Sequence, residues 1–120
     1  MKHLKGKNKR WTQETGYKRR IILPFGSEAY SNIQMQLTEI AAGNKVVRHH
    51  HAKQTEFIFF LEGSCDFTFK DITITLESGD LLIIDPNEKH SASNIYDSAA
   101  RFLTFKINGD ANDTIWDDKL

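Results

Sequence analysis

The stretch GNKVVRHHHAKQTEFIFFLEG, residues 43–63, decides the fold and the candidate site of this chain. Its histidines follow a β-prone segment, and side chains two apart on a strand project from the same face. His49 and His51 therefore present their imidazoles to one point, while His50 faces the opposite side. Glu56 opens the apolar run FIFFL, where a buried carboxylate needs a partner. A metal ion is such a partner, so the stretch predicts a metal site.

A further ligand lies downstream. His90 follows the turn 85–87 (Asp-Pro-Asn) and begins another predicted strand, from which its imidazole can return to the same interior. Cys65 is the only cysteine, so an internal disulfide framework and a Cys-rich zinc site are both excluded. The predicted ligands are three neutral imidazoles and one carboxylate, namely His49, His51, Glu56 and His90.

The pattern of the rest of the chain predicts short strands separated by turns. Residues 31–40 (SNIQMQLTEI) alternate apolar and polar side chains, which is typical of a strand with one buried face. Turns containing Gly, Pro or Asn recur at the regular spacing of an all-β sandwich or barrel, and this pattern excludes a helical bundle. The predicted strands cover residues 17–24, 31–40, 45–51, 55–61, 64–70, 72–76, 81–84, 89–95 and 100–107.

Length and hydropathy limit the domain organisation. A chain of 120 residues fits one globular domain. Its apolar runs are much shorter than the roughly 20 residues that cross a bilayer, so we expect no membrane-spanning segment. We also expect no secretory signal, which makes a cytoplasmic location the default. The predicted organisation is a basic N-terminal arm over residues 1–16, a barrel over 17–107 and an acidic C-terminal tail over 108–120.

The N-terminal region is basic although the 16 basic and 16 acidic residues of the chain cancel. Such asymmetry is found in nucleic-acid-binding arms, but a basic edge strand beside a solvated tail explains it more simply. We therefore do not expect nucleic-acid binding. The apolar, β-prone run from Tyr17 to Leu23 follows the arm, and we expect it to pair with a sheet of a second copy in a homodimer.

Two spaced motifs resemble those of the cupin superfamily. The first cupin motif, G(X)5HXH(X)4E(X)6G, is matched at every fixed position by Gly43, His49, His51, Glu56 and Gly63. The second, G(X)5PXG(X)2H(X)3N, is matched by Gly79, His90 and Asn94. Asp85 and Asn87 replace its Pro and Gly, with a proline displaced by one position to Pro86. Because Asn tolerates positive φ, we expect an equivalent turn there.

The resemblance implies a small single-domain β-barrel of jelly-roll type that holds one divalent transition metal ion inside, near its open end. It implies Fe, Mn, Ni, Cu, Co or Zn, and imidazole with one carboxylate does not select among them. It implies a mononuclear metalloenzyme acting on a small molecule, above all a dioxygenase. Two alternatives stay open: a non-catalytic module that binds or senses a small metabolite, and an isomerase.

Further polar residues complete the predicted site. Glu56 is the candidate catalytic base as well as a ligand, because a carboxylate that leaves the ion can accept a substrate proton. Asn94 shares strand parity with His90, so we expect it to face the cavity. Arg101 is a candidate anchor for a substrate carboxylate, with a surface position as the alternative. The remaining candidates for contact with a small-molecule ligand are Gln34 and Gln36.

Overall fold

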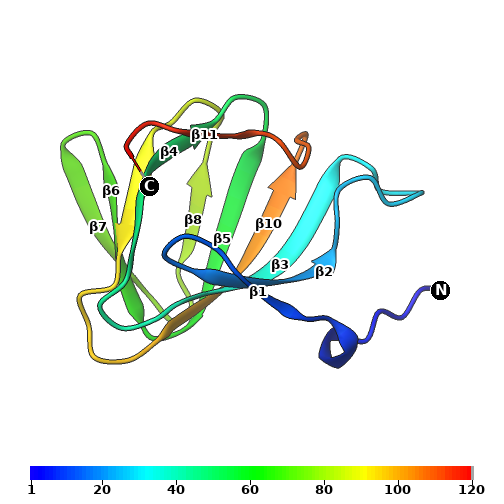
Figure 1. The fold of residues 1–120 in the computed structure, drawn as a ribbon, viewed down its shortest axis with the longest axis horizontal. Coiled ribbons are helices and arrows are strands. Elements are labelled where there is room, and N and C mark those ends of the chain that lie inside the picture. The colour runs from blue at the N-terminus through cyan, green and yellow to red at the C-terminus, as the bar shows by residue number, and fades with distance from the viewer. Residues whose placement is uncertain (120) are drawn as a thin grey trace.

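The computed structural model describes residues 1–119, which form two antiparallel β-sheets that face each other (Figure 1). The six-stranded sheet has the order β1 (Trp11–Gln13), β2 (Lys18–Leu23), β3 (Ile33–Ile40), β10 (Ala100–Ile107), β5 (Thr55–Glu62), β8 (Leu81–Ile84). The five-stranded sheet has the order β11 (Thr114–Trp116), β4 (Lys45–His51), β9 (His90–Ser93), β6 (Ser64–Phe69), β7 (Ile72–Glu77). A short 3-10 helix, η1 (Gly6–Asn8), precedes β1. Within residues 1–119, no helix has the length and apolar character needed to cross a bilayer.

The predicted strands are all present, and the all-β jelly-roll class is confirmed. Alternation is the reason, because buried and more exposed positions follow each other along β10 and along most of β3. The additional strands β1 and β11 have three residues each. Such short segments give too few positions for an alternating pattern to be recognised.

The inner face of the six-stranded sheet changes from apolar to polar along its strands. Phe102 of β10 is paired with Phe60 of β5, and their rings stack with centroids 4.9 Å apart. Four residues further along β10, Lys106 is paired with Glu56. The apolar core therefore fills one end of the space between the sheets, and buried polar side chains gather at the other end.

Two turns of the motifs require a left-handed backbone. Gly63 has φ 76°, and a Cβ atom there would lie 2.3 Å from the carbonyl oxygen of Ala99, so only glycine fits. Asn87 has φ 69°, the conformation that the second motif assigns to glycine. Its N–H donates to the carbonyl oxygen of His51 at 2.7 Å. The substituted turn is thus preserved, and it is joined to the strand that carries His51.

The acidic tail packs against the barrel. Its residues 114–116 form β11, which pairs with β4 (Figure 1). In this pairing Trp116 lies opposite His49. Asp113, 6% exposed, accepts hydrogen bonds through its carboxylate from the backbone N–H groups of Ala52, Lys53 and Gln54 at 2.8–3.2 Å. The tail therefore holds the loop that joins β4 to β5. Leu120, also assigned to the tail, lies outside the described residues.

The run from Tyr17 to Leu23, expected to pair with a second copy, is paired within its own chain. β2 has β3 on one side and, over residues 18–20, β1 on the other. Large apolar side chains are exposed elsewhere, on the outer face of β5 and β8, namely Phe59, Leu61, Leu81 and Ile83. This outer face carries apolar groups that the same face of a second copy would complement around a two-fold axis. The homodimer stays a prediction, with this face as its interface.

We expect replacing Asp113 by Ala to destabilise the fold by about 2–4 kcal/mol, because three backbone N–H groups lose a charged acceptor. Urea denaturation measures the free energy of unfolding. The control is Asp118→Ala, which removes a tail carboxylate whose ion pair with Arg48 is half exposed, and it should cost less than about 1 kcal/mol. Equal losses in the two variants would contradict the role given to Asp113.

For assembly, we expect light scattering to show a dimer and the double substitution Leu81→Lys, Ile83→Lys to give a monomer, because buried lysines without partners oppose association. Ile72→Lys is the control, since Ile72 is exposed on β7 of the other sheet. Dissociation by the control to the same degree, or a monomeric wild-type protein, would rule out this interface.

Candidate metal centre

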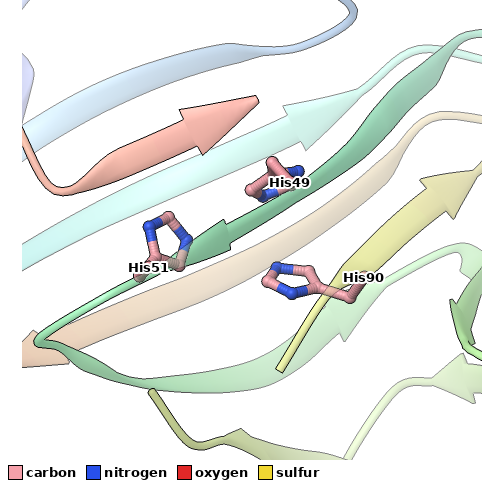
Figure 2. Close-up of side chains that lie close together, drawn as sticks. All are labelled: His49, His51 and His90. Atoms are coloured by element: carbon pink, nitrogen blue, oxygen red, sulfur yellow. The ribbon is translucent and has the colours of Figure 1, made fainter. Parts of the chain in front are cut away.

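Three imidazoles meet in the space between the sheets. His49 and His51 lie two apart on β4 and therefore on one face. His90 begins β9, where it is the direct partner of His49. One ring nitrogen from each histidine lies within 4.8 Å of the other two, and the rings turn toward the same space (Figure 2). The structure thus brings together the three histidines that the sequence predicted as ligands.

The backbone sets which nitrogen of each ring is available. Each Nδ1 lies at hydrogen-bond distance from a backbone carbonyl oxygen, and a carbonyl only accepts, so Nδ1 carries the proton. The bonds are 2.8 Å from His49 to Val47, 3.0 Å from His51 to Asp113 and 2.8 Å from His90 to Glu88. In the neutral rings, the lone pairs of the Nε2 atoms are then left to bind a cation, which is the arrangement found around metal-binding histidines.

Glu56, 8% exposed on β5, completes the predicted set. Its Oε1 lies 3.2 Å from Nε2 of His51 and 3.7 Å from Nε2 of His90. With neutral rings these atoms are all acceptors, and acceptors at such distances repel each other unless a cation or a proton lies between them. Within residues 1–119, Nε2 of His51 and Oε1 of Glu56 are buried without a hydrogen-bond donor. This donor set fits a transition metal ion.

The electrostatics of the site keep its groups in their ligating forms. Burial, reinforced by the nearby charge of His90, lowers the pKa of His49 to about 4. Burial also lowers the pKa of His90, although Glu56 opposes the shift. Burial alone would raise the pKa of Glu56, but the adjacent His51 and the charge of Lys106 outweigh it and lower that pKa. Near neutral pH, His49 is therefore neutral and Glu56 is ionised, as metal ligands must be.

The site opens into a cavity of about 540 Å³ between the sheets. Apolar side chains of the core, including Ile58, Phe67 and Phe102, form part of its wall. Trp116 of β11 forms another part, with its ring centroid 4.9 Å from that of His49. This volume suits a small molecule, and its mixed lining is typical of ligand-binding sites.

Gln34 and Gln36, predicted to contact a ligand, line this cavity and are buried. They belong to a chain of hydrogen bonds along the inner face of the sheet. The amide of Gln34 donates to Gln36 at 2.9 Å, and Gln36 donates to the hydroxyl of Thr38 at 3.0 Å. Thr38 is bonded in turn to Thr104 at 3.0 Å. These bonds orient the amides and give the cavity one polar wall.

The structure places Asn94 and Arg101 away from the cavity. Asn94 follows the end of β9 and is buried, as its parity with His90 predicts, but it does not line the cavity. Its amide group donates to two backbone carbonyl oxygens at 2.9 Å and accepts the N–H of Tyr96 at 3.0 Å, which fixes a loop. Arg101, half exposed on β10, forms ion pairs with Glu39 at 2.6 Å and Glu62 at 3.3 Å. It therefore takes the surface position that was the alternative.

Two cationic residues of the cavity were not predicted from the sequence. Lys106 is 8% exposed and lines the cavity beside Glu56, and Arg19 of β2 lines it as well. Strand parity carries the signal for Lys106, because it shares the inward parity of Phe102 and Thr104 on β10. No such signal exists for Arg19, since β2 is half-buried at every position.

Comparison with known proteins agrees with this fold. The computed structure superposes on the polyketide cyclase RemF from Streptomyces resistomycificus with a TM-score of 0.81 at 19% identity, covering 100% of this chain and 87% of that one. A predicted oxalate decarboxylase from Thermotoga maritima gives 0.77 at 18% identity, with 89% and 99% covered. An uncharacterized protein with a double-stranded β-helix domain from Klebsiella pneumoniae gives 0.77 at 16% identity, with 99% of both chains covered.

At these identities the three structures support the shared fold alone. No curated protein sequence matches the chain. The family model described as "Cupin domain" matches residues 36–106, which include β4, β5 and His90. This match spans more than half of the chain and contains all four predicted ligands. On that evidence, the chain belongs to the cupin domain family.

Proposed function

We propose that this protein is a mononuclear metal-dependent enzyme that acts on a small molecule in the cavity between its sheets. The observation that carries the proposal is the cluster of facing acceptors: imidazole Nε2 atoms and the Oε1 atom of Glu56 converge, and Nδ1 of each ring is already bound to a carbonyl. The proposed ligands are His49, His51, Glu56 and His90. Fe, Mn, Ni, Cu, Co and Zn are all compatible with this donor set.

The reaction class that we propose is oxygenation of a substrate with an acidic proton. A bound ion would supply a positive charge for an anionic oxygen of the substrate. The apolar wall would pack against the body of the substrate, and the hydrogen-bonded glutamines would orient its polar groups. Glu56 is the residue placed to accept the proton, since its ionised carboxylate is buried beside the histidines.

Several structural neighbours support a catalytic role over a purely binding one. They are described as a polyketide cyclase, a predicted oxalate decarboxylase and a DMSP lyase, and each of these descriptions names an enzyme for a small molecule. The non-catalytic alternative, a module that binds or senses a metabolite, uses the same cavity and the same ion. An isomerase remains a further alternative. Oxygen uptake by the metal-loaded protein with catechols, β-diketones and thiols separates oxygenation from the others.

We expect elemental analysis to find about one ion per chain, and His51→Ala to remove most of it, because one of four ligands is lost. Chelation should also lower the melting temperature of the wild-type protein, since the ion binds only the folded state. His50→Ala is the matched control. Its ring bonds to Asp117 at 2.9 Å instead of turning inward, and its metal content should not change. Full occupancy in the His51→Ala protein would refute the ligand assignment.

Glu56→Gln tests the catalytic role. Three histidines remain, so we expect the variant to keep much of its metal and to lose turnover by about 10² to 10⁴-fold, the usual contribution of a general base. The measurements are metal content and steady-state rate on a substrate found in the oxygen-uptake screen. Wild-type metal content together with a wild-type rate would leave Glu56 a structural ligand at most.

A further inference from the structure

Lys106 is a buried cation that forms no ion pair within residues 1–119. It is 8% exposed, and none of the ion pairs and hydrogen bonds within residues 1–119 involves its ammonium group. Its direct cross-strand partners are Glu56 on one side and Gln34 on the other, both lining the cavity. Because paired residues start side by side and both line the cavity, the charge of Lys106 acts on Glu56, one of the predicted metal ligands. A buried charge in this position requires a counter-charge.

The other acidic groups that line the cavity are already paired. Glu14 forms an ion pair with Arg19 at 3.3 Å, and Asp110 forms one with Lys53 at 2.9 Å. Glu56 is the remaining carboxylate of the described lining, and a divalent ion would use its charge. The loaded cavity would then hold surplus positive charge from both the ion and Lys106. Nε of Arg19, buried without an acceptor, adds a further unsatisfied donor.

We propose that the cavity binds a small carboxylate whose oxygens are shared between the ion and the ammonium group of Lys106. This rests on the proposed function, because it names the class of substrate for the same site. A carboxylate supplies the missing negative charge and accepts hydrogen bonds at two oxygens. The wall formed by Ile58, Phe67 and Phe102 accommodates an apolar body attached to it. A small carboxylic acid with an apolar or aromatic body would supply negative charge to the cationic part of the cavity and apolar surface to its wall.

The test compares benzoate with benzamide, which has the same ring and no charge, and with inorganic phosphate. Binding to the cobalt-loaded protein is measured by calorimetry. We expect benzoate to bind at least about tenfold more tightly than benzamide, since hydrogen bonds to charged groups are the strong ones. Lys106→Met should lower benzoate affinity by about tenfold or more and leave benzamide affinity within about twofold. Met keeps an unbranched apolar side chain at this buried position.

The controls separate charge from packing and from metal loading. Lys106→Arg keeps the charge and should keep the preference for benzoate. Lys7→Met removes an exposed lysine of η1 and should change nothing. Cobalt content must equal that of the wild type in each variant, so that a loss of benzoate binding is not a loss of metal.

Unchanged benzoate affinity in Lys106→Met at full cobalt content would overturn the proposal. Tighter binding of phosphate than of benzoate would overturn it also, by assigning a different anion. If the wild-type protein takes up no cobalt, the proposed function fails. The benzoate and benzamide comparison on the metal-free wild type and Lys106→Met then still decides whether Lys106 binds a carboxylate.

Discussion

The candidate site depends on hydrogen bonds between imidazole Nδ1 atoms and backbone carbonyl oxygens. A free imidazole exchanges its proton between two nitrogens and rotates, whereas a ring held at Nδ1 by an acceptor of fixed position presents Nε2 in one direction. Val47 and Glu88 lie two residues before the histidines that they hold, so these two rings are oriented by their own strand or turn. His51 differs, because its acceptor is the carbonyl of Asp113, 62 residues away.

The space between the sheets has an apolar end, which stabilises the fold, and a polar end, which holds the candidate site. Stacked aromatic rings close one end of the space between the sheets and give stability without polar groups. At the other end the same strands carry a carboxylate, amides, hydroxyls and an ammonium group, which are costly to bury unless each meets a partner. Gln34, Gln36, Thr38 and Thr104 satisfy one another. Nε2 of His51 and Oε1 of Glu56 have no such partner within residues 1–119, and this separates a prearranged ligand site from a structural polar network.

The predicted metal ligands could be found from the sequence, whereas several other residues of the cavity and the tail could not, for physical reasons. Parity on one strand brings His49 and His51 together, and the motif spacing adds Glu56 and His90. Parity correctly predicts that Asn94 is buried, but it does not predict that the amide binds backbone carbonyl oxygens instead of facing the cavity. Burial of Lys106 is not expected from residue type, because lysine is normally a surface residue, although its parity on β10 is inward. The role of the tail depends on contacts between distant segments, such as Asp113 with residues 52–54, which no local pattern encodes.

The long-range anchor of His51 has a consequence for the order in which the protein matures. Asp113 and β11 are synthesised after all the other strands, so a nascent chain already carries every predicted ligand before the carbonyl that orients His51 has emerged. During that interval His51 is held only by its own strand, and the loop from Ala52 to Gln54 lacks its carboxylate acceptor. Assembly of the complete donor set therefore follows translation of the tail, and binding of the proposed ion would follow it.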